Sequence, residues 1–211
     1  MERNLAVVMD VDGVIFDYVG QLGDVVSTIL DRPRNEFPPA DTWDFMTQQW
    51  GMEFDEYLEL VEQGVRDHKF FSKGIPLPGS SVGWKMLADS GARIHIASHC
   101  GITSLASQEQ QNRLEWLDEW GFIYDDITFT PDKASVAKMY LDQGWEVASL
   151  DDHVDNYWAL HEVGSVSYLA HQRSNSHVPT TRRVANVEEF AKKINSTRIG
   201  MAPLEGTTSR A

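Results

Sequence analysis

Several reactive side chains follow apolar runs of strand length. In chain order they are the acids Asp10 and Asp12, the hydroxyl of Ser98, the ammonium of Lys133 and the acids Asp151 and Asp152. Carboxylate oxygens bind hard cations such as Mg²⁺, and a free carboxylate can attack an electrophile such as phosphorus. A hydroxyl and an ammonium can neutralise charge on the remaining phosphate oxygens. The set therefore indicates phosphoryl transfer to an aspartate, with Mg²⁺ bridging the acids and the phosphate.

The first of these stretches also has a purely structural interpretation, in which Asp12 and Gly13 simply make a turn after a buried strand. Asp10 and Asp12 are two residues apart, so in an extended chain they point the same way, and Gly13 lets the backbone turn sharply. The later groups decide between the two interpretations, because they repeat the same chemical theme at other strand ends.

The predicted elements must bring these groups together. Apolar runs at 5–9, 92–98, 126–130, 146–150 and 166–170 alternate with segments of helical periodicity. Such alternation is typical of α/β proteins, in which the carboxyl ends of parallel strands share one edge and form a crevice for ligands. We predict an α/β fold with a Rossmann-like parallel sheet sandwiched by helices.

One long segment interrupts the alternation. Helical periodicity fills residues 17–31 and returns at 54–65, with a loop rich in proline and aromatic residues between. We predict a small helical cap over 17–76, inserted after the first strand of a core made of 1–16 and 77–195. Residues 196–211 are polar and lack periodicity, so we predict a flexible tail.

The composition limits the binding partners that the protein can have and the cellular compartment in which we expect it. The net charge is −14 and no basic run is present, so a long nucleic acid is a poor partner. The single cysteine, Cys100, excludes an internal disulfide framework. No apolar stretch has membrane-spanning length and the first strand starts too early for a signal peptide, which predicts a cytoplasmic protein. The pair Trp116 and Trp120 is expected in the core or on a homodimer surface.

The motifs resemble those of the haloacid dehalogenase-like (HAD) phosphatases, on Asp10-Val11-Asp12-Gly13-Val14, Ser98, Lys133 and Asp151-Asp152. Within that superfamily the sequence is similar to the 5'(3')-deoxyribonucleotidases. The further stretches that carry this similarity are Asp12 to Tyr18, Phe70 to Gly79, Thr130 to Lys133, His171 to Arg173 and Val178 to Arg183. The resemblance spans about Leu5 to Ile194. It implies a HAD-like core and the dephosphorylation of deoxynucleoside monophosphates.

The resemblance also implies a two-step reaction. Asp10 would attack the phosphate to form an aspartyl-phosphate, while Asp12 would protonate the leaving oxygen and then activate water. Mg²⁺ would be held by Asp10, the backbone carbonyl of Asp12 and one of Asp151 or Asp152.

The same resemblance implies the contacts to the substrate. Ser98, His99 and Lys133 would bind the phosphate, although the family typically has Thr-Ser-Pro where this chain has Ser98-His99-Cys100. The cap aromatics that flank the base and the sugar would be Tyr18, Phe45 and one of Phe70 or Phe71.

Three other functions compete with this one. A polynucleotide 3'-phosphatase is disfavoured by the acidic charge and by the predicted cap, which suits a small enclosed substrate. A phosphatase of another small metabolite, such as a sugar phosphate, stays open. A catalytically inactive nucleotide-binding protein of the same fold is disfavoured because binding alone needs no acid/base residue at Asp12.

Overall fold

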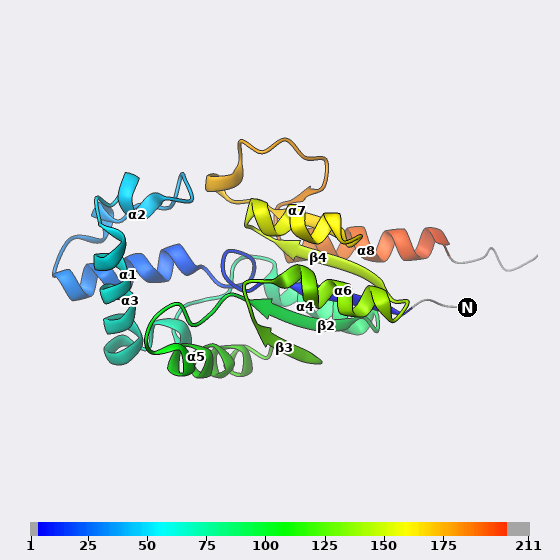
Figure 1. Ribbon diagram of the computed structural model, residues 1–211, viewed down its shortest axis with the longest axis horizontal. Coiled ribbons are helices and arrows are strands. Elements are labelled where there is room, and N and C mark those ends of the chain that lie inside the picture. Colours follow the sequence, from blue (N-terminus) through cyan, green and yellow to red (C-terminus); the bar gives the residue numbers. More distant parts are fainter. Residues whose placement is uncertain (1–3, 202–211) are drawn as a thin grey trace, which may run out of the picture.

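The computed structural model describes residues 4–201, in which helices cover a six-stranded sheet (Figure 1). The strands are β1 (Leu5–Met9), β2 (Arg93–Ser98), β3 (Asp126–Phe129), β4 (Glu146–Asp151), β5 (Val166–Ala170) and β6 (Arg183–Val184). All pairs are parallel and the order is β3-β2-β1-β4-β5-β6. Strand order therefore reverses between β1 and β4, the switch point at which open α/β sheets bind ligands. The predicted α/β fold is confirmed, and β6 is a short strand beyond those expected.

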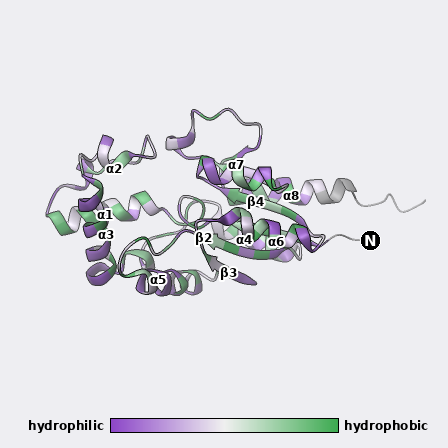
Figure 2. Ribbon diagram, in the orientation of Figure 1, coloured by the Kyte–Doolittle hydropathy of each residue, from purple (hydrophilic) through white to green (hydrophobic). Residues whose placement is uncertain are grey.

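Both faces of β1 are buried, which explains its unbroken apolar sequence. Leu5, Val7 and Met9 belong to a core cluster with residues of α4 (Ser80–Asp89), α5 (Ala106–Glu119) and α8 (Val187–Met201). Ala6 and Val8 belong to a second cluster with residues of α6 (Lys133–Asp142) and α7 (Val154–Glu162). In Figure 2 the strands β2 and β4 are largely in the hydrophobic colour, whereas the edge strand β3 is more hydrophilic.

The segment after β1, for which we predict a helical cap, is helical. It contains α1 (Tyr18–Leu30), the 3-10 turn η1 (Arg34–Glu36), α2 (Phe45–Gln48), α3 (Phe54–His68) and the 3-10 turn η2 (Phe70–Ser72). Residues of α1, α2, α3 and η2 share a hydrophobic cluster of their own, separate from the two clusters that pack against the faces of the sheet. The two connections to the core run together, because the Leu77 amide donates to the Ile15 carbonyl at 2.8 Å and Phe16 pairs with Pro76.

The C-terminal helix is longer than the sequence indicated. Helix α8 continues to Met201, so the predicted flexible tail is wrong for residues 196–201. The hydroxyls of Ser196 and Thr197 donate to the Lys193 carbonyl, so both side chains bond to the backbone of the same helix. Residues 202–211 of the predicted tail lie outside the described part of the chain. Between residues 4 and 201, none of the helices combines the length and the apolar character needed to cross a lipid bilayer.

Candidate active site

Three carboxylates and one ammonium meet where β1 and β4 end. Each of Asp10, Asp151 and Asp152 offers a carboxylate oxygen within 4.8 Å of the others, and all three residues are buried. Lys133 Nζ lies 2.6 Å from Asp10 Oδ2 and 2.8 Å from Asp151 Oδ2, with its side chain 3% exposed. The backbone of β1 and β4 sets this geometry, since the Asp10 amide donates to the Leu150 carbonyl at 3.1 Å. The structure thus brings together four of the residues that the sequence placed at one sheet edge.

The two adjacent acids after β4 have different surroundings. Both oxygens of Asp151 are engaged, Oδ2 with Lys133 and Oδ1 with the His153 amide at 2.8 Å and the Asn156 side-chain amide at 3.2 Å. The Asp152 carboxylate accepts no hydrogen bond from residues 4–201, and it lines a large cavity. Asp151 therefore orders the cluster, whereas Asp152 keeps its oxygens free for a ligand.

Gly13 makes room for the free carboxylate. Its φ of +71° lies in the left-handed region, and a Cβ added there would sit 2.0 Å from Asp152 Oδ2. Gln172 also holds this turn, because its Nε2 donates to the Gly13 carbonyl at 2.5 Å. The turn after Asp12 is therefore one wall of the acid cluster, which goes beyond the purely structural interpretation.

The cluster holds more negative charge than Lys133 balances. Burial raises the pKa of Asp10 to about 7; the charge of Lys133 opposes this rise, while Asp151 and Asp12 add to it. Burial also raises the pKa of Asp152 well above its ordinary value, and the charges of Asp10 and Asp151 add to that effect. A divalent cation would supply the missing positive charge, and the carboxylate oxygens are hard ligands of the kind that such cations prefer. These residues therefore fit a metal site.

Asp12 contacts helix α5. Arg113 Nη2 donates to Asp12 Oδ1, and the two side chains form an ion pair in which the guanidinium is fully buried. Burial raises the pKa of Asp12, and the charges of Arg113 and Lys133 oppose that rise. Arg113 is not among the site residues predicted from the sequence. The one signal for it was a charged residue three positions before Trp116, on the face of α5 that is buried.

The loop after β2 carries the predicted phosphate ligands. The Ser98 hydroxyl is buried and has no hydrogen-bond partner within residues 4–201, while His99 is exposed and lines the cavity. Glu109, which the sequence analysis missed, holds this loop: its carboxylate accepts from the amides of residues 101, 102 and 103 at 2.8, 3.2 and 3.2 Å. Burial raises the pKa of Cys100 to about 12, so its thiol is a poor nucleophile.

A cavity of about 720 Å³ separates the acids from the cap. Its walls include three of the predicted aromatics, Tyr18, Phe45 and Phe71, whereas Phe70 is fully buried in the cap cluster and does not line it. Tyr57, which the sequence analysis did not name, also lines the cavity, with its hydroxyl 2.5 Å from that of Tyr18. The volume falls within the range of small-molecule sites in proteins.

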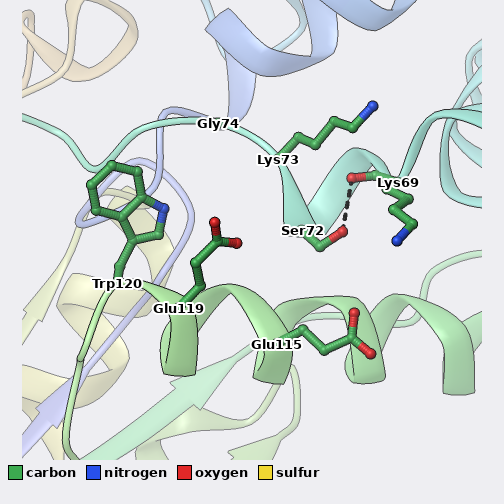
Figure 3. A pocket seen from close by; sticks show the side chains of 7 residues that line it. All are labelled: Lys69, Ser72, Lys73, Gly74, Glu115, Glu119 and Trp120. Atoms are coloured by element: carbon green, nitrogen blue, oxygen red, sulfur yellow. Dashed lines mark hydrogen bonds between the residues drawn. The ribbon is translucent and has the colours of Figure 1, made fainter.

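A second, smaller hollow of about 400 Å³ lies between η2 and α5. Figure 3 shows two lysines, Lys69 and Lys73, on one side and two glutamates, Glu115 and Glu119, on the other. Its mixed charges and the absence of any member of the acid cluster from its lining leave the larger cavity as the candidate active site.

Solved structures of low sequence identity share the fold. A haloacid dehalogenase-like family hydrolase from Streptococcus pneumoniae has a TM-score of 0.58 at 16% identity, over 90% of this chain and 98% of that one. A β-phosphoglucomutase from Clostridium difficile has a TM-score of 0.56 at 13% identity, over 92% and 98% of the two chains. These similarities confirm a HAD-like fold.

Sequence comparison is more specific. The chain is 30% identical over 186 residues to a protein of Chlorobaculum tepidum named "Putative 5'(3')-deoxyribonucleotidase", which covers 86% of this chain and 87% of that protein. Residues 3–199 match the family model described as 5' nucleotidase, deoxy (pyrimidine), cytosolic type C protein. The chain therefore belongs to this 5'-nucleotidase family of the HAD superfamily and is a phosphoric monoester hydrolase of that type.

Proposed function

We propose that the protein is a Mg²⁺-dependent phosphatase that hydrolyses (deoxy)nucleoside monophosphates through an aspartyl-phosphate on Asp10. The observation that carries the proposal is that Asp10, paired with Lys133, lines the same cavity as aromatic residues of the cap. Family membership supports the reaction class, and the cavity supports a small enclosed substrate.

The residues that would hold the metal are Asp10, Asp152 and the backbone carbonyl of Asp12. Asp152 is preferred to Asp151 because the oxygens of Asp151 already accept three hydrogen bonds, whereas those of Asp152 accept none within the described chain. When bound, Mg²⁺ would polarise the phosphate and offset the charge of the acids.

The side chains of the site can perform both steps. The Asp10 carboxylate is oriented by the Val11 amide, 2.7 Å from Oδ1, and by Lys133 at Oδ2. An Asp10 oxygen bonds to phosphorus as the bond from phosphorus to the nucleoside oxygen breaks, and Asp12 gives its proton to that oxygen. Asp12 then takes a proton from water that attacks the aspartyl-phosphate, which releases phosphate and regenerates Asp10. Lys133 and the unpaired Ser98 hydroxyl neutralise the phosphate oxygens meanwhile.

The cap side of the cavity would select the nucleoside. Tyr18, Phe45 and Phe71 offer ring faces and edges to a base. An apolar wall at the sugar would leave a ribose 2'-hydroxyl without a partner, which disfavours ribonucleotides. The name of the Chlorobaculum tepidum relative and the description of the family support a deoxynucleotide substrate.

A substrate panel tests the proposal. Phosphate release is measured with Mg²⁺ and with EDTA. The substrates are dUMP, dTMP, UMP, a deoxynucleoside 3'-monophosphate, a sugar phosphate and a 3'-phosphorylated oligonucleotide. We expect Mg²⁺-dependent turnover of the deoxynucleoside monophosphates and none by the Asp10→Asn variant. Turnover of the oligonucleotide alone would contradict the nucleotidase proposal, and full activity of Asp10→Asn would contradict the aspartyl-phosphate mechanism.

A further inference from the structure

Arg113 is a fully buried cation in the middle of α5. Glu109, four residues earlier, is the natural partner for it on a helix, yet Glu109 binds the loop amides after Ser98. Within the described chain, the one carboxylate that Arg113 pairs with is Asp12, through Nη2. Its Nε and Nη1 have no hydrogen-bond partner there.

Aromatic rings surround the rest of the guanidinium. Its Cζ lies 4.2 Å from the ring centroid of Phe16, 4.9 Å from that of Phe71 and 5.9 Å from that of Trp116. A planar guanidinium can stack on rings while one edge binds a carboxylate, which a lysine ammonium does less well. These contacts come from the core connection, the cap and α5, so Arg113 lies where the three meet.

Burying this charge is costly for the fold. A buried cation is destabilising unless it is paired, and apolar side chains of similar volume often replace a buried ion pair without loss of stability. A methionine at this position of α5 would pack against the same rings at no such cost. The arginine is therefore better explained by what it does to Asp12 than by packing.

The contact to Asp12 is one-sided. Arg113 holds Oδ1, and no residue from 4 to 201 hydrogen-bonds to the second oxygen, although Asp12 lines the cavity. Phe71 contacts the guanidinium and also lines the cavity. Arg113 therefore contacts both the Asp12 carboxylate and an aromatic residue of the cavity wall. Arg113 itself does not line the cavity.

We propose that Arg113 is a positioning residue for Asp12, which holds Oδ1 so that the second oxygen faces the leaving oxygen of the substrate. The inference rests on the proposed function, because it assumes that Asp12 protonates that oxygen. It assigns Arg113 a task in the first step, where the bond to the nucleoside breaks, and none in contacting the phosphate.

Leaving-group dependence tests this assignment. A nucleoside alkoxide needs a proton to depart, whereas p-nitrophenolate does not, and kcat/KM reports only the steps up to departure. For Arg113→Met we expect kcat/KM to fall about 100-fold with dUMP and less than about fivefold with p-nitrophenyl phosphate. Arg113→Lys should fall between wild type and Arg113→Met with dUMP. Arg66→Met, the same change at an exposed arginine, is the matched control.

The Asp12→Asn background separates positioning from packing. If Arg113 acts through Asp12, then Arg113→Met changes kcat/KM for p-nitrophenyl phosphate less than about twofold once Asp12 is already Asn. Equal losses with both substrates, or a loss of more than about twofold with p-nitrophenyl phosphate in the Asp12→Asn background, would overturn the inference. If Arg113→Met does not fold, Arg113→Lys decides by the same substrate comparison. Absence of turnover by the wild-type protein would overturn the proposed function and this inference together. Equal losses of kcat/KM with dUMP and p-nitrophenyl phosphate in Arg113→Met would overturn the inference alone.

Discussion

Replacing Asp10 with asparagine should stabilise the metal-free protein while it abolishes hydrolysis. The pKa of Asp10 rises from 3.8 to about 7 on folding, chiefly because the side chain is buried. Between these two pH values the unfolded chain releases the proton while the folded protein keeps it, so stability falls as pH rises and the loss is complete above about 7. At about 1.4 kcal/mol for each tenfold change in proton affinity, the loss is about 4 kcal/mol. Asparagine resembles the protonated acid and avoids it.

Urea unfolding in EDTA measures the effect. At pH 8 we expect the midpoint of Asp10→Asn to lie about 2 M urea above that of the wild type, given about 2 kcal/mol/M for a domain of this size. Near pH 4 the two midpoints should nearly coincide. Asp118→Asn, the same change at an exposed position of α5, should show no such dependence on pH. A variant no more stable than wild type at pH 8, or a difference that persists at pH 4, would refute the reasoning.

Three further outcomes follow from the site. Gly13→Ala should weaken Mg²⁺ binding at least about tenfold in calorimetric titration, because the new Cβ would lie 2.0 Å from Asp152 Oδ2; unchanged affinity would contradict this wall of the cluster. Glu109→Gln should lower the free energy of unfolding by about 2 kcal/mol in urea, since a charged acceptor of three loop amides is lost; a neutral effect would show that the loop needs no such acceptor. Mg²⁺ should raise the thermal midpoint of the wild type more at pH 8 than at pH 5.5, because Asp10 must lose its proton to bind; an equal rise at both values would argue against Asp10 as a ligand.

The central strand β1 could be predicted because every residue in it is buried and its sequence is uniformly apolar, and β2 and β4 are buried in all but their first residue. The same logic placed the acids, since parallel strands end at one edge. The burial and the partners of the charged side chains on α5 were not predictable in this way. Glu109 and Arg113 are four residues apart, a spacing typical of an ion pair on an exposed helix face. In the structure both are buried and each has a partner outside the helix, which depends on the cap and the loop after β2.

The roles of two neighbouring residues of the same type could not be told apart from the sequence either. Asp151 and Asp152 are indistinguishable in sequence, and their roles separate only because the His153 amide, Asn156 and Lys133 all reach Asp151. The pKa of Asp10 could not be predicted from the neighbouring charges alone. The charge of Lys133 lowers this pKa, but burial, which the sequence does not quantify, raises it by more.

The reversal of strand order between β1 and β4 affects how the enzyme is made. Strand β1 leaves the ribosome first, but its partner β4 and the acids that follow emerge only after the cap, β2 and β3 have been synthesised. Asp10 can therefore meet Asp151 and Asp152 only after most of the described chain has been made. The repulsion among these acids arises only when β4 docks beside β1, so the acid cluster cannot form while the cap, β2 and β3 are being synthesised.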